Sequence, residues 1–254
     1  MLRPTDELRA LVEDYLGGLE LLPELGSLRE PMRYALGGKR VRPVLCLATA
    51  DALGADLQRI LPAAAAVELV HSFSLVHDDL PALDDDRERR GAPSVWARYG
   101  EAAGILAGDA LLAEALRLAL GYPTPEVARE LCDATLRMIG GQQLDLEGTA
   151  DLARLHALKT GALFSASVMC ALWAAGEPAA AHGPWRAFAA ELGLLFQIVD
   201  DLLDGDGYVL ETGEERARRL ADEAAERARA RLAEIDAETD VLRSIVDGLA
   251  VRTA

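Results

Sequence analysis

The sequence is poor in cysteine, in basic residues and in long uninterrupted apolar segments, and each shortage excludes a class of protein. It has only three cysteines, Cys46, Cys132 and Cys170, which are odd in number, widely spaced and set among apolar residues. This pattern argues against a disulfide framework or a zinc site and predicts reduced thiols in the core. A cytoplasmic location is therefore expected.

The charge balance is acidic, with 42 Asp and Glu residues against 26 Lys and Arg and a net charge of −16. A nucleic-acid surface needs a basic stripe that neutralises phosphates, and these basic residues form no obvious stripe. The most apolar windows are interrupted by His, Asp or Glu before about 18 residues pass, and the acidic N-terminus has no apolar signal core. We expect no nucleic-acid partner and no membrane span.

Apolar residues recur at intervals of three and four almost throughout, whereas the alternation of β-branched residues that is typical of strands is scarce. The sequence therefore predicts an all-α protein of about ten helices. The helices are expected near residues 5–20, 28–36, 41–53, 58–79, 95–119, 125–140, 151–158, 160–175, 184–204, 212–234 and 239–250. No stretch reads as an interdomain linker and no repeat is evident, so residues 1–254 are expected to form one domain. The charged, Ala-rich segment 211–234 is expected to be a solvent-exposed outer helix.

The stretch LVHDDLPALDDD, residues 75–86, places five aspartates in nine positions directly after an apolar helix. Two unit charges about 4 Å apart repel by roughly 4 kcal/mol at an effective dielectric constant near 20, so this cluster requires cations. Pro81 lacks a backbone N–H and should end the helix. Residues 80–84 can then curl back and bring Asp84 near Asp78.

A second acidic stretch, FQIVDDLLDGDG, occupies residues 196–207. Gln197, Asp200, Asp201 and Asp204 have the spacing i, i+3, i+4 and i+7, which predicts one polar stripe facing a cavity. Carboxylate-rich sites of this kind suit Mg²⁺, which takes its remaining ligands from water and phosphate oxygens. A di-iron carboxylate bundle is the rival metal site, but Glu68 and His71 form the only Glu-x-x-His pair. The alternative without a metal is that these aspartates decorate solvated helix ends, where they would oppose the helix dipole.

Basic residues cluster at turns, in GGKRVRP (37–43), RERRG (87–91) and KTG (159–161). Lys39 and Arg42 can point together from a helix start, and Arg89 and Arg90 follow the first acidic cluster closely enough to hold a phosphate. GGQQLDL, residues 140–146, adds a polar patch, although Gly140 and Gly141 would also suit a helix C-terminus.

Taken in order, GGKRVRP, HSFSLVHDDLPALDDDRERRG, GDALL, GGQQLDL, KTGALF and FQIVDDLLD resemble the motifs of short-chain trans-polyprenyl diphosphate synthases over about residues 30–205. The resemblance implies an all-α bundle around a central active-site cavity, a homodimer, and Mg²⁺ ions that clamp an allylic diphosphate. By this likeness the metal ligands are Asp78, Asp84, Asp200 and Asp204, with Asp79 and Asp201 as supporting acids. Lys39, Arg42, His71 and Arg90 match ligands of isopentenyl diphosphate, while Arg89, Lys159 and Gln197 match residues around the allylic diphosphate. Thr160 matches the position beside the reacting carbons.

The expected chemistry is ionisation of the allylic diphosphate, attack by the isopentenyl double bond and loss of a proton, all in a dry apolar cavity. No side-chain nucleophile is needed, and no convincing Ser-His-Asp or Cys-His arrangement is present. Bulky Phe73 beside small Ser74, together with the DDLPALD form, resembles bacterial farnesyl diphosphate synthases, which stop at fifteen carbons. We therefore expect farnesyl diphosphate, with geranylgeranyl diphosphate as the alternative product.

The sequence departs from the family pattern after DDLLD. The family continues through a longer loop with a lysine that reaches the allylic diphosphate, whereas GDGYVLETGEERARRL runs almost directly into the next helix. Arg216, Arg218 or Arg219 are the candidate substitutes. This shortening leaves a second hypothesis open, a weakly active diphosphate-binding subunit that regulates another synthase. A terpene cyclase is a third hypothesis, against which the second diphosphate pocket argues.

Overall fold

The computed structural model describes residues 2–148 and 151–251, and these are almost entirely helical. The predicted all-α class is confirmed. The helices are α1 (Thr5–Gly17), η1 (Pro23–Leu28), α2 (Arg29–Ala35), α3 (Val41–Ala52), α4 (Leu57–Asp78), α5 (Val95–Tyr99), α6 (Glu101–Ala119), α7 (Glu126–Leu146), α8 (Leu152–His156), the π-helix η2 (Ala157–Gly161), α9 (Ala162–Ala175), η3 (Ala179–Ala181), α10 (His182–Asp204), α11 (Gly207–Thr212), α12 (Glu214–Ala233) and α13 (Asp240–Ala250). Strands β1 (Glu88–Arg89) and β2 (Ala92–Pro93) pair as a short antiparallel hairpin.

Helix α4 lies at the centre of the bundle because it is apolar around most of its circumference. It packs against α3, α6 and α9, and its run of small residues from Ala63 to Ala66 is completely buried. Asp56 caps its N-terminus by accepting a hydrogen bond from the Gln58 amide at 3.1 Å. The position of Asp78, the C-terminal residue of this helix, is therefore fixed by a well-packed helix.

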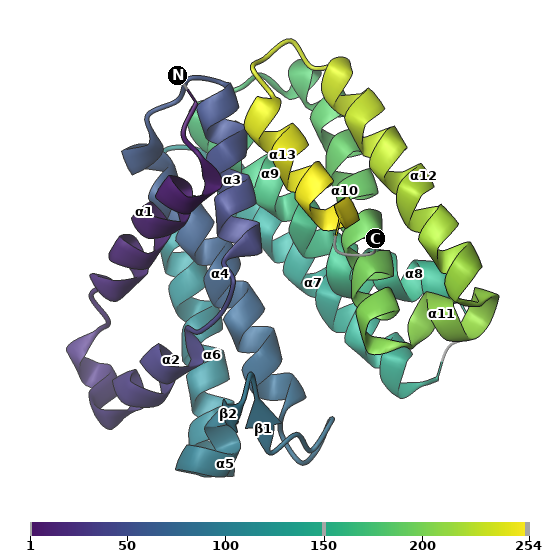
Figure 1. Ribbon diagram of the computed structural model, residues 1–254. Coiled ribbons are helices and arrows are strands. Elements are labelled where there is room, and N and C mark those ends of the chain that lie inside the picture. The colour runs from purple at the N-terminus through teal and green to yellow at the C-terminus, as the bar shows by residue number, and fades with distance from the viewer. Residues whose placement is uncertain (1, 149–150, 252–254) are drawn as a thin grey trace.

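Helix α10 holds the equivalent place in the other half of the molecule. It packs on α9 and on α12, whose alanines at 217, 221, 224, 225 and 228 are buried while its charged residues face outward. The predicted solvent-exposed outer helix is thus confirmed. Figure 1 shows α4 and α10 descending to the same end of the molecule, where the β1–β2 hairpin, α11 and the C-terminal end of α7 also lie.

The predicted break between helices 151–158 and 160–175 is absent, because α8, η2 and α9 follow one another directly. Two other predicted boundaries were wrong because of a glycine. Helix α7 does not end at Gly140 but continues through GGQQLDL to Leu146. A Cβ atom at Gly141 would lie 2.5 Å from the Lys159 amide nitrogen, so this glycine permits a close crossing with η2 rather than a helix end. The predicted helix 95–119 is divided at Gly100, whose φ is +91°. The short helix α11 was not predicted at all.

Two helical segments, Leu57–Asp78 and Leu152–Ala175, are long and apolar enough to cross a membrane by length and composition alone. In the structure 72% and 56% of their most apolar windows are buried against other helices. Both segments are therefore accounted for as parts of the protein core.

Candidate active site

A cavity of about 420 Å³ opens between α4, α7, η2 and α9. Its apolar wall is formed by Phe73, Leu75, Leu83, Met138, Ile139, Leu146 and Leu163. Its polar lining comprises Arg42, His71, Ser74, His77, Asp78, Gln142, Gln143, Lys159 and Thr160. A largely apolar cavity with a set of charged and polar groups in its lining suits a ligand that has a charged head and a hydrocarbon tail.

The aspartates at residues 78–86 form the first acidic row, and the backbone that carries them turns back as the sequence predicts. Helix α4 ends at Asp78, and the Asp84 amide then donates to the Asp78 carbonyl at 2.9 Å, so the chain after Pro81 curls back. Burial, together with neighbouring Asp84, raises the pKa of Asp78 to about 6. Asp79 points elsewhere: it is 2% exposed and forms an ion pair with Arg89.

Residues 197–204 of α10 form the second acidic row, and their polar side chains do not all face the same way. Burial and the charge of Asp204 raise the pKa of Asp200 to about 6, and Arg42 and Lys39 oppose this rise from across the site. Asp201, one position on, is buried and accepts hydrogen bonds from Gln197 and from the Tyr208 amide. The prediction that all four side chains face one cavity was wrong, because adjacent helical residues point about 100° apart.

The acidic residues at the C-terminal ends of α4 and α10 supply the oxygen donors that Mg²⁺ prefers. Burial, and after it the charge of a neighbouring carboxylate, raises the pKa of the half-buried Asp78 and Asp200, and a divalent cation would relieve both effects. Within residues 2–148 and 151–251, no group of three or more Asp, Glu, His or Cys side chains is placed to hold a metal ion without other ligands. A Mg²⁺ ion bound by either row would have to take its remaining ligands from phosphate and water.

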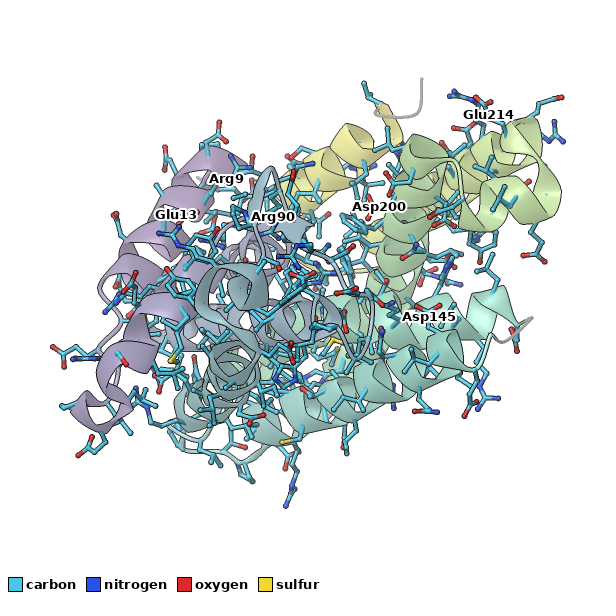
Figure 2. All side chains as sticks on the ribbon, turned by 90° about the horizontal axis from the view of Figure 1, so that it is seen from below. Arg9, Glu13, Arg90, Asp145, Asp200 and Glu214 are labelled. Atoms are coloured by element: carbon cyan, nitrogen blue, oxygen red, sulfur yellow. The ribbon has the colours of Figure 1, made fainter. Side chains whose placement is uncertain are left out.

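A cationic pocket lies beside the first acidic row. Burial and the charges of Arg42, Arg90, Arg89 and Arg40 hold the pKa of His71 well below its usual value. Arg40 and Arg89 already pair with carboxylates, so Arg42 and Arg90 are the guanidinium groups near this neutral imidazole that could bind an anion. Figure 2 views this end of the molecule and labels Arg90 in the hairpin, Asp200 on α10 and Asp145 on α7.

The arginines of this pocket differ in how they are held. Arg42 lies 4.8 Å from the centre of the Phe164 ring, its Nε has no partner, and burial lowers its pKa to about 10. The Arg90 side chain packs on Gly37 and Gly38 and donates to the Gly37 carbonyl. Lys39 is exposed. Arg89 is already bound by Asp79 and Asp86, so it would have to exchange or share these partners to hold a phosphate.

The π-helix η2 carries Lys159 and Thr160 into the cavity. The Lys159 ammonium donates to Asp145 at 2.6 Å, and the Thr160 hydroxyl donates to Gln197 at 2.7 Å. The sequence predicts Lys159, Thr160 and Gln197 as site residues, and the structure brings Thr160 and Gln197 into direct contact. Asp145 was not predicted as the partner of Lys159.

Two further residues were not identified as site residues from the sequence. The sequence places Gln142 only in a polar patch, yet its amide nitrogen and oxygen are both buried in the cavity wall without a partner. Such an amide is available to a ligand. Arg40 is 4% exposed and bridges Glu13 and Glu68, so it organises the cationic pocket rather than facing it. The αL conformation of Arg40, with φ at +57°, has no signal in the sequence.

A family model described as polyprenyl synthetase matches residues 26–222 of the chain. The chain belongs to the polyprenyl synthetase family. It is 40% identical over 207 residues to a farnesyl diphosphate synthase of Geobacillus stearothermophilus, an alignment that covers 74% of this chain and 70% of the relative. It is 39% identical over 217 residues to a geranylgeranyl diphosphate synthase of Cyanophora paradoxa, covering 78% and 72%. A solved FPP/GFPP synthase from Zymomonas mobilis superposes with a TM-score of 0.83 at 34% identity, covering 97% and 95%.

As a polyprenyl synthetase, the protein is a trans-prenyltransferase with the all-α isoprenoid synthase fold. The segment after Asp204 is where the sequence is expected to depart from the family pattern. It folds as α11 and runs directly into α12. The three candidate substitutes for the missing lysine each pair with a glutamate of α12: Arg216 with Glu223, Arg218 with Glu214 and Arg219 with Glu215. None of them lines the cavity.

The two residues expected to set product length both line the cavity of this polyprenyl synthetase. Phe73 is 6% exposed and meets His77 edge to face, with ring centres 5.0 Å apart. The Ser74 hydroxyl donates to the His71 carbonyl, so it is held along the helix. Phe73 is thus the bulkiest group contributed by α4 to the cavity.

Proposed function

We propose that the protein condenses isopentenyl diphosphate with dimethylallyl or geranyl diphosphate and releases farnesyl diphosphate. One observation carries this proposal: two unlike anion sites adjoin one apolar cavity, an acidic row suited to a metal-bound diphosphate and a pocket of arginines around neutral His71. A cyclase or hydrolase acting on a single diphosphate needs only one of them.

Asp78 and Asp84 on one side and Asp200 and Asp204 on the other would hold Mg²⁺, which neutralises charge on the departing diphosphate. Lys39, Arg42, His71 and Arg90 would bind the isopentenyl diphosphate, with Gln142 able to contribute its unpartnered amide. Arg89, Lys159 and Gln197 would surround the allylic diphosphate. The apolar wall excludes water from the allylic cation, and Thr160 lies where the new bond forms.

The test is turnover by the purified protein with Mg²⁺, isopentenyl diphosphate and either allylic starter, with products sized by mass spectrometry. Asp78→Ala and Asp200→Ala should each lower kcat about 100-fold or more while the far-ultraviolet circular dichroism is unchanged. Asp222→Asn, on the exposed face of α12, is the control and should retain full activity. Near-normal turnover in either site variant would refute the assignment. Tight diphosphate binding without turnover would favour the regulatory-subunit alternative.

Geranylgeranyl diphosphate is the second candidate product. The chain is about as similar to a geranylgeranyl diphosphate synthase as to farnesyl diphosphate synthases, so similarity does not separate the two. The same mass spectrum distinguishes products of fifteen and twenty carbons.

The protein is further proposed to act as a cytoplasmic homodimer in which residues 1–254 form one catalytic domain. One continuous hydrophobic core extends from α1 to α13, which supports a single domain. Exposed apolar side chains on neighbouring helices α6 and α7, among them Leu106 and Leu136, support a second copy as the partner.

A further inference from the structure

Three side chains form a hydrogen-bonded row that leads away from the catalytic cavity. The Thr160 hydroxyl donates to Gln197 Oε1 at 2.7 Å, and Gln197 Nε2 donates to Asp201 Oδ1 at 2.7 Å. The other oxygen of Asp201 accepts from the Tyr208 amide at 2.9 Å. Thr160 lines the cavity, whereas Asp201 is 3% exposed and does not.

The segment after the second acidic row is wrapped around Asp201. The amides of Gly205 and Asp206 donate to the Asp201 backbone carbonyl at 2.8 and 3.2 Å. A Cβ atom on Gly207, whose φ is +45°, would lie 2.2 Å from the Asp201 carboxylate, so only glycine admits this approach. The shortened connection between α10 and α12 therefore fixes the orientation of one carboxylate.

That carboxylate dictates the direction of every hydrogen bond in the row. Both of its oxygens act as acceptors, so the amide of Gln197 must turn its NH₂ group toward Asp201 and its oxygen toward Thr160. The Thr160 hydroxyl must then donate its proton to the Gln197 oxygen. The lone pairs left on the Thr160 oxygen are free to face the cavity.

We propose that Asp201 is a positioning residue that acts through Gln197 to hold the Thr160 hydroxyl with its negative end toward the reacting carbons. This proposal rests on the proposed function, because an oxygen lone pair is useful there only if positive charge develops on the allylic carbon. A dipole fixed before the reaction stabilises that charge without reorganising at the moment of reaction. The adjacent residues Asp200 and Asp201 thus have separate roles. Asp200 would bind the metal, and Asp201 would orient the Thr160 hydroxyl.

The deciding variant is Asp201→Asn, which has nearly the same shape but carries a donor. Its NH₂ group would face either the Tyr208 amide or Gln197, and in the second case Gln197 turns over and presents a donor to Thr160. We expect kcat to fall about tenfold or more, with KM for both substrates and the Mg²⁺ activation constant nearly unchanged. Asp201→Glu keeps the acceptor-only group and should retain more activity than Asp201→Asn, and Asp222→Asn is the matched surface control.

A double-mutant cycle identifies the route of the effect. If Asp201 acts through Gln197, then adding Asp201→Asn to Gln197→Leu should lower kcat little further. Full kcat in Asp201→Asn, additive losses in the double variant, or a weakened response to Mg²⁺ would each overturn the proposal. If Asp201→Asn does not fold, Gln197→Leu carries the test, because it also removes the acceptor of the Thr160 hydroxyl proton and should lower kcat to a similar extent. Absence of turnover in the wild type would instead refute the proposed function, so the two failures are distinguishable.

Discussion

At the scale of single residues, the acidic rows place function in conflict with stability. Asp78 is held in a partly buried position next to Asp84, and its pKa is raised to about 6. In the unfolded chain an aspartate titrates near pH 3.9. Between these values the folded protein retains the proton that the unfolded chain releases, so the free energy of unfolding falls as pH rises and is lowest above pH 6.

Asp78→Asn should therefore stabilise the metal-free protein at neutral pH. After allowance for solvent screening we expect a gain of about 1–2 kcal/mol in the free energy of unfolding at pH 7.5, shrinking as the pH approaches 5. Thermal melts in EDTA at several pH values measure it, with Asp222→Asn as a control that should show no such trend. A loss of stability on removal of the charge would contradict this prediction. Mg²⁺ with diphosphate should raise the Tm of the wild type more than that of the variant.

Phe73 is a residue whose size should matter more than its chemistry. Replacing it by Ala, or more mildly by Leu, removes the bulkiest group that α4 contributes to the cavity and should shift product toward longer chains. Mass spectrometry of the products measures the shift. Phe188→Leu is the matched control, because Phe188 is fully buried outside the cavity and should affect only stability. An unchanged product profile in both Phe73 variants would mean that other residues limit chain length.

The sequence indicated candidate site residues better than it indicated their orientation. Asp78, Asp84 and Asp200 could be proposed because carboxylates grouped at the ends of apolar helices repel one another unless a cation lies between them. Their partners could not be predicted: that Arg89 is occupied by Asp79, or that Asp201 turns toward Tyr208, depends on tertiary contacts that no local pattern encodes.

At the scale of elements, the spacing of apolar residues located the helices, whereas glycines led to wrong predictions of where some helices end. Gly140 and Gly141 look alike in the sequence, and both suit a helix end. In the structure Gly140 faces open space, and Gly141 meets the backbone of Lys159 where η2 crosses α7. Helix propensity alone cannot tell a helix end from a crossing point.

This difference gives a matched pair of substitutions. Gly141→Ala would place a Cβ 2.5 Å from the Lys159 nitrogen, so η2 must move, and we expect a loss of about 1–3 kcal/mol together with reduced kcat. Gly140→Ala should instead gain about 0.5–1 kcal/mol with activity unchanged. Chemical denaturation and steady-state kinetics measure both effects. Equal behaviour of the two variants would show that the crossing of η2 and α7 does not control the position of Lys159.

At the scale of the whole molecule, α6 and α7 present apolar side chains to solvent on neighbouring helices. Ile105 and Leu106 on α6 are 47% and 55% exposed, and Leu136 and Ile139 on α7 are 67% and 47% exposed. Ile139 also lines the catalytic cavity. A second copy packed on these helices would therefore both cover the apolar surface and close the wall of the cavity.

Light scattering coupled to size exclusion should give twice the chain mass of 27.2 kDa for the wild type. Leu136→Glu places a charge within the proposed interface and should yield monomers with lower turnover, because the cavity then admits water beside Ile139. Val251→Glu adds the same charge at another exposed apolar position, at the end of α13, and should leave both mass and turnover unchanged. A wild-type protein that is monomeric and fully active would show that one chain closes its own cavity, and that the exposed side chains of α6 and α7 serve another purpose.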